Sequence, residues 1–301
     1  MTQRLPVSAR RVFEQGLFCY LAVGAAEGLH VTPVVFVYSS GRIWVTTART
    51  SVKARSWRLD PAVAGLVRAA DLAVAFRGRV RTYAALDPLS WPGAAAAGPR
   101  LALAATRFSL KNARFFAGYA MDARRLPLAW TPPARLFAGI ELTAGRVLDL
   151  EARTVREGWG VWPAGASFRE DVSPLSRARG IDLKVPAGVR KAVGQAGLGA
   201  LALGGAHGPV VLPARWRRVP AQGSFESVLP VAFADLSEAP DRAQAALAAD
   251  HASAWRATEM AGMILQGTAD LFDPPEGKEA LVRLRPDRVV WWSGWSSGSV
   301  A

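Results

Sequence analysis

The feature that most constrains the fold is a series of short segments near the start of the chain, rich in valine and aromatic residues and separated by turns. Residues 18–24, 29–38 and 42–47 form the series, with Gly28 and Gly41 in the turns between them. Valine and aromatic side chains favour strands, and the short glycine-containing connections are typical of β-hairpins. The pattern predicts an antiparallel meander, and therefore a mainly β (α+β) domain.

The flanking segments extend this pattern. A short helix is predicted over 6–15, and a second one that either Thr50 or Ser51 can cap. The second helix ends at Asp60-Pro61, because the residue before a proline avoids helical geometry. We expect further strands at 62–67 and 72–83, a bulge at Gly78, and a hairpin over 135–150 that turns at Gly145. An insertion at 88–133 interrupts them, with a loop over 91–99 and helix over 101–121.

The second half of the chain repeats the first. Gly16–Ala25 matches Gly197–Ala206, and three further matches follow in the same order: Pro33 with Pro213, Gly78 with Gly267, and the segments 140–150 and 281–292, which both read as hairpins. Four ordered matches indicate a tandem duplication. We therefore predict one domain over 1–160, a linker near 160–185, and a second domain over 185–301.

Charge is distributed unevenly between the halves. The chain carries a net charge of +13; residues 1–150 hold 20 basic and 8 acidic residues, against 17 and 16 in residues 151–301. An anionic partner bound by the first half is the simplest explanation. There is no recognised nucleic-acid motif and no dense basic tract, so a phosphorylated small molecule is favoured over nucleic acid.

Other classes of protein receive no support from the composition. No apolar stretch approaches the roughly 20 residues of a membrane-spanning helix, and the start does not resemble a signal peptide, so a cytoplasmic protein without membrane contact is expected. Cys19 is the single cysteine, which excludes an intrachain disulfide and a cysteine metal cluster. It is expected to be a small buried side chain.

The chemically informative cluster follows the third predicted strand. That strand ends in Thr46 and Thr47, and a turn then presents Ser51, Lys53 and Arg55 at the start of a helix. Hydroxyl groups, a lysine, an arginine and a helix N-terminus together suit a phosphate monoester. A capped surface helix with solvated charges is the alternative that the local pattern leaves open.

The order of these features resembles the FMN-binding split-barrel family, whose best-known member is pyridoxamine 5′-phosphate oxidase. Strand, His-Val-Thr-Pro-Val, hairpin, Thr-Thr, Thr-Ser-x-Lys-x-Arg, helix and Asp-Pro occur in that order over residues 8–85. The resemblance implies two split β-barrels in tandem. It places Thr32, Pro33, Val34 and Val35 along a flavin ring, Thr46 and Thr47 near the ribityl chain or phosphate, and Ser51, Lys53 and Arg55 on the phosphate, with added charge from Arg77, Arg79 or Arg81.

The same resemblance implies an FMN-dependent oxidoreductase acting on an unidentified small molecule. Family members that use the deazaflavin F420, or that bind flavin or haem without catalysis, provide the alternatives. His30 is the haem-ligand candidate, with packing as its other interpretation. The family binds its cofactor between two barrels, which here belong either to one chain or to a homodimer.

Two further expectations follow from the duplication. An indole from Trp291–Trp295 is a candidate to cover the flavin ring from the second barrel, with core packing as the alternative. Around Pro240–Ala246 no Ser-x-Lys-x-Arg survives, so one cofactor site per chain is predicted. The three histidines lie too far apart to indicate a metal site, and the sequence names no catalytic acid or base.

Overall fold

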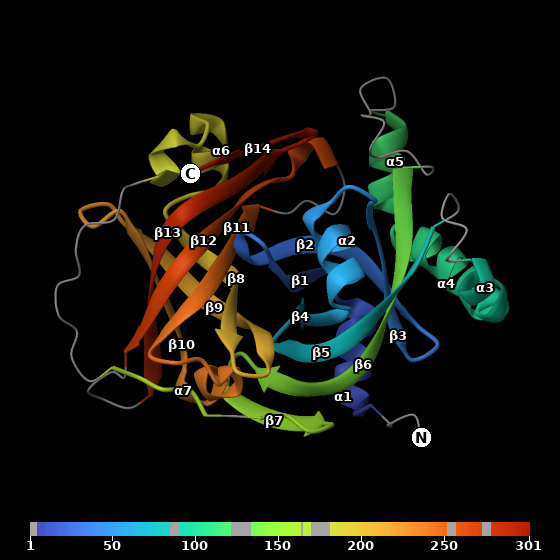
Figure 1. Ribbon diagram of the computed structural model, residues 1–301, viewed down its shortest axis with the longest axis horizontal. Helices are drawn as coiled ribbons and strands as arrows, with labels where there is room; N and C mark the ends of the chain where they lie inside the picture. Colours follow the sequence, from blue (N-terminus) through green and yellow to red (C-terminus); the bar gives the residue numbers. More distant parts are fainter. Residues whose placement is uncertain are drawn as a thin grey trace.

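Antiparallel strands divide the chain into two sheets with the same strand order. The computed structural model describes residues 5–84, 91–121, 134–163, 165–169, 181–251, 257–272 and 278–301. The sheets run β3-β2-β1-β4-β5-β6-β7 and β10-β9-β8-β11-β12-β13-β14, and the extra pairings β3–β6 and β10–β13 close each into a barrel (Figure 1). Two barrels in tandem, as the resemblance implies, are therefore confirmed.

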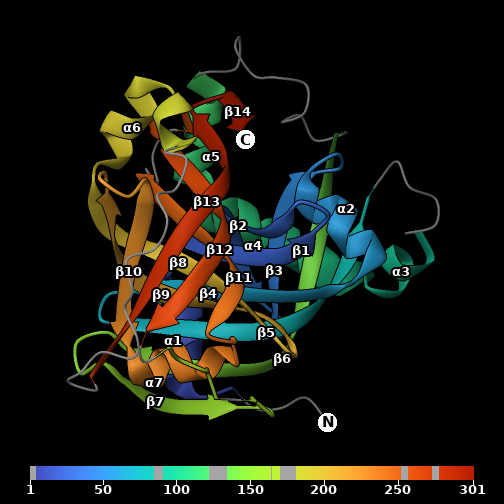
Figure 2. The ribbon, with the colours of Figure 1, turned by 60° about the vertical axis from the view of Figure 1, so that its left-hand side comes forward.

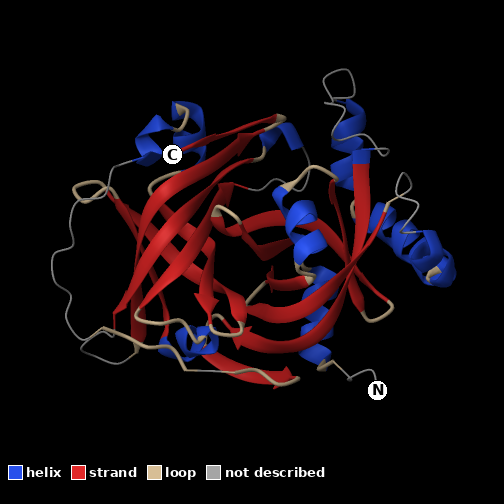
Figure 3. Ribbon diagram, viewed as in Figure 1, coloured by secondary structure: helices blue, strands red, loops and turns tan. Residues whose placement is uncertain are grey.

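The first barrel carries a helix before its strands, a helix between β3 and β4, and a helical insertion between β5 and β6. Its elements are α1 Val7–Gln15, β1 Phe18–Ala25, β2 Gly28–Ser39, β3 Arg42–Ala48, α2 Val52–Leu59, β4 Ala62–Ala69, β5 Leu72–Tyr83, α3 Trp91–Ala96, α4 Gly98–Lys111, α5 Ala113–Met121, β6 Arg135–Asp149 and β7 Thr154–Trp159. Figure 3, viewed as Figure 1, shows α1 and α2 near the centre of the molecule and the insertion helices α3, α4 and α5 together on the right-hand side of this barrel.

The second barrel repeats this order without the long insertion. Its elements are the 3₁₀ turn η5 Ile181–Lys184, α6 Ala187–Val193, β8 Ala196–Gly205, β9 Gly208–Val219, β10 Ser224–Pro230, α7 Val231–Ala234, η6 Asp235–Ser237, β11 Arg242–His251, η7 Ala257–Glu259, β12 Ala261–Phe272, β13 Glu279–Ser293 and β14 Ser296–Val300. None of the helices that the structure describes is long and apolar enough to cross a membrane.

Matching irregularities support the duplication. The β5–β6 register shifts between Arg77 and Gly78, and the β12–β13 register shifts between Gln266 and Gly267. The bulge expected at Gly78 is thus present and repeated. The alignment of the first strands needs a correction of one residue: the β1–β2 and β8–β9 hairpins close at Ala25↔Gly28 and Gly205↔Gly208, so Ala25 corresponds to Gly205.

Two local predictions were wrong. The hairpins expected over 140–150 and 281–292 are parts of the continuous strands β6 and β13. Gly145 lies inside β6, not in a turn. The residue is a glycine because any Cβ at this position would overlap the Trp159 ring. The loop predicted over 91–99 is largely helical, since α3 begins at Trp91 and α4 at Gly98. Alanine, the strongest helix former, dominates α3 and outweighs its proline and glycine.

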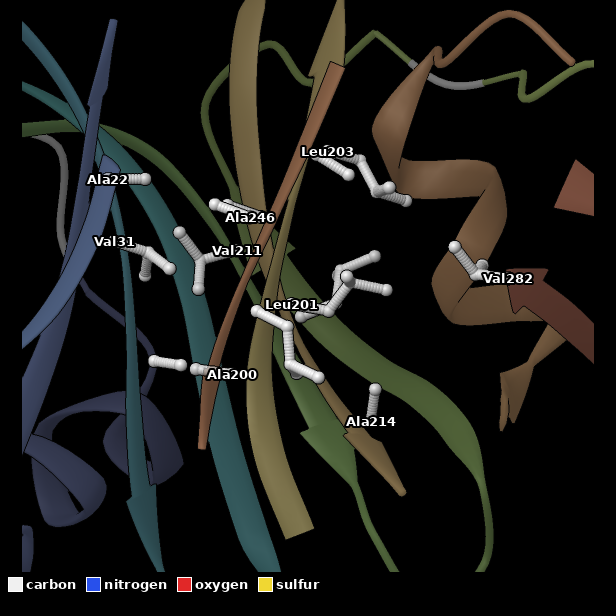
Figure 4. Packing of buried hydrophobic residues seen from close by; sticks show 14 of the residues in the cluster. Ala22, Val31, Ala200, Leu201, Leu203, Val211, Ala214, Ala246 and Val282 are labelled. Atoms are coloured by element: carbon white, nitrogen blue, oxygen red, sulfur yellow. The ribbon is translucent and has the colours of Figure 1, made fainter. Parts of the chain in front are cut away.

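Small residues let the two barrels approach closely. Ala22 and Val31 of the first barrel lie beside Val211 and Ala246 of the second, within one hydrophobic cluster that crosses the junction (Figure 4). Strands β8, β9 and β11 of the second barrel contact β1, β2 and β4 of the first, and Figure 2 shows these strands in the turned view. Burial of such apolar surface contributes roughly 25 cal/mol per Å². The barrels therefore form an intrachain pseudo-dimer.

Polar contacts also cross this junction. Gln266 Nε2 donates to the Leu29 carbonyl at 2.5 Å, and the Gln266 side chain is 3% exposed. The Tyr20 hydroxyl donates to Asp250 at 3.3 Å and accepts from Arg68 at 2.9 Å. Desolvation, reinforced by the Asp250 carboxylate, raises the pKa of Tyr20 to about 12. Buried donors and acceptors with partners on the opposite barrel fix the relative position of the barrels.

We expect Gln266→Leu to lower the free energy of unfolding by about 1–3 kcal/mol, because the Leu29 carbonyl loses a buried donor. Urea denaturation followed by tryptophan fluorescence measures the change. Gln244→Leu, an exposed glutamine on β11, is the matched control and should have little effect. Equal stabilities of wild type and Gln266→Leu would show that this contact does not hold the junction.

Candidate functional site

The candidate site begins where strands β2 and β3 separate. Their pairing runs from Ser39↔Arg42 to Phe36↔Val45 and stops there. Beyond that point Thr32–Val35 pairs with β1, while Thr46–Ala48 pairs with β6. One backbone edge of β2 is therefore not used by β3. A proline is tolerated inside a strand with such an edge, which explains Pro33.

A cavity of about 350 Å³ occupies this opening. The size lies within the roughly 300–1,000 Å³ of small-molecule sites. Strands β2 and β3 and the start of α2 contribute nine lining residues, which include eight of the nine predicted cofactor residues: Thr32, Pro33, Val34, Val35, Thr46, Thr47, Ala48, Ser51 and Lys53. Phe18, Phe115 and Arg135 complete this side of the wall.

Lys53 is the buried cation of the cavity. Its side chain is 7% exposed, and its ammonium donates a short hydrogen bond to Thr32 Oγ1. Burial, together with the nearby Arg135, lowers the pKa of Lys53 to about 8. No carboxylate is among the described residues that line the cavity. A desolvated cation in such a wall is best stabilised by an anion, because water cannot replace the missing countercharge.

The start of α2 supplies hydroxyl groups beside this lysine. Ser51 is the N-cap of α2, and its Oγ accepts from the Ala54 amide at 3.1 Å. Thr47 donates to the same oxygen at 3.0 Å, which leaves the Ser51 hydroxyl hydrogen for another acceptor. The positive end of the helix dipole adds to the field of Lys53. Capping and anion binding are thus compatible here.

Arg135 is a second cation of the wall, which the sequence did not reveal. It is the first residue of β6 and pairs with Ala48 of β3. Its Nε donates to Thr46 Oγ1 at 2.7 Å and its Nη2 to the Thr46 carbonyl at 3.0 Å. Arg135 could have been identified only from its position opposite the end of β3, after Thr46 and Thr47. That position becomes known only when β3 is paired with β6.

The second barrel closes the cavity from the other side. Its β13–β14 hairpin contributes most of that wall, together with one residue before β12: Met260, Trp292, Gly294, Trp295, Ser296 and Ser297. Trp295 and Trp292, whose ring also packs on Gly262, line the cavity where an indole could cover a ring. Trp291 packs on Gly298 and is not among the described residues that line the cavity. Phe115 comes from α5, so the helical insertion also borders the cavity. The cavity lies between the halves of one chain.

The other predicted basic residues lie elsewhere. Arg55 is exposed and donates to the Thr50 carbonyl at 2.7 Å, because positions two apart on a helix point in nearly opposite directions. Arg77 joins the barrel junction, 3.6 Å from Glu238 and over the Trp162 ring. Arg79 and Arg81 are exposed on β5. None of these four lines the cavity.

The pseudo-symmetric position in the second barrel has a different character. Its short helix α7 replaces α2, so the counterpart of the Ser51 cap is Pro230, and not the segment around Pro240, which enters β11. The segment 230–234 contains no cation, and Phe233 packs in the hydrophobic cluster with Trp162 and Leu236. The described residues therefore supply the phosphate-type cluster once per chain.

No group of three or more histidine, cysteine or acidic side chains among the described residues could hold a metal ion. Cys19 is buried in the first barrel, and this burial raises its thiol pKa far above the usual range. A thiolate is the reactive form of cysteine, so this burial disfavours a nucleophilic role. The chemistry available at the site is binding by cations, hydroxyl groups, backbone and aromatic rings.

Neither a family model nor a curated protein matches the chain. Solved structures that resemble it include an F420 reductase, 19% identical, which covers 47% of this chain and 98% of its own with a TM-score of 0.32. A pyridoxamine 5′-phosphate oxidase-related, FMN-binding protein from Nostoc punctiforme is 14% identical, covers 48% and 79%, and has a TM-score of 0.34. An FAD-binding protein from Mesorhizobium loti is 14% identical, covers 48% and 94%, and has a TM-score of 0.32.

Without a ligand, the burial of Lys53 should cost stability. We expect Lys53→Met to raise the free energy of unfolding of the ligand-free protein at pH 7 by about 1–3 kcal/mol, since an apolar side chain of similar length needs no countercharge. Folded Lys53 has a pKa of about 8, whereas the ordinary pKa of a lysine side chain, as in the unfolded chain, is 10.5. Between these two pKa values the unfolded state binds more protons than the folded state, so the free energy of unfolding of the wild type rises with pH. The difference in free energy of unfolding between Lys53→Met and the wild type therefore shrinks as the pH is raised.

Urea denaturation at pH 7 and pH 10 tests this expectation. Lys191→Met removes an exposed lysine of α6 and serves as the control for the loss of one positive charge. A Lys53→Met variant less stable than the wild type at pH 7 would contradict the account of a desolvated, uncompensated cation.

Proposed function

We propose that the protein is an oxidoreductase that binds a phosphate-bearing flavin-type cofactor, FMN or the deazaflavin F420, in the cavity between its barrels and acts on a small molecule. The observation that carries the proposal is the position of the buried Lys53, next to Thr32 and the Ser51 cap, at the edge of an otherwise largely apolar cavity. A ligand with an anionic group at one end and a flat ring at the other would match both parts of the cavity wall: the anion would lie at Lys53 and Ser51, and the ring would lie against the apolar part.

The donor set fits the phosphate of such a cofactor. Lys53 offers a charged donor, Ser51 an unused hydroxyl hydrogen, and α2 the positive end of its dipole. Arg135 holds Thr46 in place and adds positive potential. Charge-assisted hydrogen bonds of this kind contribute about 1.5–3 kcal/mol each when buried. Together they would offset the cost of removing Lys53 from water.

The rest of the wall suits a tricyclic ring. The unpaired edge of β2 over Thr32–Val35 offers backbone groups to the polar edge of the ring, and Trp292 or Trp295 offers an aromatic face. When bound, the cofactor would supply the electron transfer, whereas the protein binds and orients it and excludes water. Phe115 of the insertion and Trp295 border the side from which a substrate would approach.

We expect the purified protein to bind FMN or F420 and Lys53→Met to weaken that binding by about ten- to a hundredfold, as the loss of one charged hydrogen bond implies. Absorbance and fluorescence titrations of both cofactors measure the affinities. Arg79→Gln, which removes an exposed arginine of β5, is the charge-matched control. A protein that binds neither cofactor at micromolar concentration would refute the proposal.

The affinity should also depend on pH with a definite sign. Only protonated Lys53 attracts the phosphate, and its pKa in the free protein is about 8. Between pH 7 and pH 9 the dissociation constant should therefore rise about tenfold, while the phosphate, with a second pKa near 6, stays ionised. Lys53→Met should show a flat profile over this range. A wild-type affinity that does not change would mean that Lys53 does not contact the anion.

A further inference from the structure

The helical insertion meets the first barrel at the point where β2 separates from its neighbours. Phe36 is the last residue of β2 that pairs with β3, and the pairing of β2 with β1 ends one residue earlier, at Val35. Asn112, between α4 and α5, is 7% exposed, and its Nδ2 donates to the Phe36 carbonyl at 3.4 Å. The insertion therefore supplies a buried donor to β2 beside Val35, which lines the cavity.

Asn112 also determines how α5 leaves α4. Its backbone amide donates to the Phe108 carbonyl at 3.1 Å, and its Nδ2 donates to the same oxygen at 2.9 Å. Its own carbonyl accepts from the Phe116 amide at 3.0 Å, at the start of α5. Since a side-chain amide has two donor hydrogens, one can serve Phe36 and the other Phe108. One residue thus joins the end of α4, the start of α5 and the barrel.

Lys111 provides a second anchor beside Asn112. Its ammonium donates to the Phe13 carbonyl at 3.1 Å, near the C-terminus of α1, and lies 3.9 Å from the centroid of the Phe36 ring. A cation is favourable both at the negative end of a helix and over the face of an aromatic ring. The junction of α4 and α5 is therefore fixed to α1 as well as to β2.

From this junction α5 leads away from α4 and contacts η7 of the second barrel, just before Met260 (Figure 1). Phe115, within the first turn of α5, is 8% exposed and lines the cavity, as Met260 does. Its ring packs edge-on against Phe116, whose ring lies 5.9 Å from that of Phe108. The position of Phe115 therefore depends on how α5 is held.

Phe115 differs in origin from the rest of the cavity wall. Among the described residues that line the cavity, the others belong to the two barrels and α2, and Phe115 alone comes from the insertion. The second barrel carries no corresponding insertion between β12 and β13. A cavity of about 350 Å³ that holds a tricyclic cofactor leaves little room for a second molecule, so one large side chain decides much of what fits.

We propose that Phe115 determines the size of the substrate that reaches the cofactor, and that Asn112 is the residue that positions it. The inference rests on the proposed function. A side chain that fills the space beside the cofactor excludes larger molecules by overlap, and its truncation admits them. Loss of the Asn112 amide should have the same consequence, because it releases the start of α5 from β2 and from α4.

A thiol reports the position of α5 without any cofactor. Phe115→Cys introduces it in the cavity wall, while Cys19, the single cysteine of the chain, is buried. We expect iodoacetamide to label the introduced thiol about tenfold faster when Asn112→Leu is added, since leucine cannot donate and α5 opens more often. Ser109→Ala, which removes an exposed hydroxyl of α4, is the matched control and should leave the rate unchanged. Equal rates with and without Asn112→Leu would overturn the positioning role.

Selectivity is measured by stopped-flow oxidation of the protein-bound reduced cofactor, FMN or F420. The cofactor gives two electrons and two protons to benzoquinone, which has one ring, or to phenanthrenequinone, which has three, and either quinone becomes its hydroquinone. We expect Phe115→Ala and Asn112→Leu each to shift the ratio of the two rate constants about tenfold toward phenanthrenequinone. The dissociation constant of the cofactor should stay within about twofold of the wild-type value, since no contact with its phosphate is removed.

The outcomes separate this inference from the proposed function. If the wild type binds neither cofactor, the proposed function fails and the selectivity of Phe115 falls with it, while thiol labelling still decides whether Asn112 positions α5. If a cofactor binds and Phe115→Ala leaves the ratio unchanged, the proposed function stands and the inference is overturned. Phe115→Leu keeps an apolar side chain and protects the test against a variant that does not fold. It should shift the ratio in the same direction by less, and an unchanged ratio counts against the inference.

Discussion

The structure depends on the separation of β2 from β3 after the pair Phe36↔Val45. A barrel closes through continuous pairing, so a strand that leaves its neighbour must find other contacts for its backbone and side chains. Here β3 continues on β6, β2 continues on β1, and the second barrel covers the opening. The site therefore exists because two barrels are joined in one chain.

Duplication followed by divergence explains why the phosphate-type cluster occurs once. Both barrels keep the strand order and the bulge at Gly78 and Gly267, which are requirements of closure. Only the first keeps a full helix with a serine cap and a buried lysine, whereas the second places Phe233 in the hydrophobic cluster. Among the described residues, the first half thus supplies both cations of the wall, in agreement with the uneven distribution of charge along the chain, and the second half supplies both of its tryptophans.

Local sequence was sufficient to predict the strands β1 to β5, a hydroxyl cap at Thr50 or Ser51, and the gathering of Thr32–Val35 with Lys53, since each depends on neighbours close in sequence or on the order of a family pattern. Long-range packing limited the rest. Arg135 reaches the cavity only through the β3–β6 pairing, and Gly145 is a glycine because a distant tryptophan covers it. Arg55 was misassigned because helix rotation, not sequence proximity, decides which side chain enters a cavity.

The central claim is that the opening between β2, β3 and the β13–β14 hairpin binds a phosphate-bearing cofactor through Lys53. A crystal structure of the protein grown with F420 or FMN tests it most directly. The account predicts one ligand per chain in this opening, its phosphate within hydrogen-bond distance of Lys53 and Ser51 and its ring beside Trp292 or Trp295. A ligand bound elsewhere, or a phosphate facing bulk solvent while Lys53 keeps Thr32 as its partner, would contradict it.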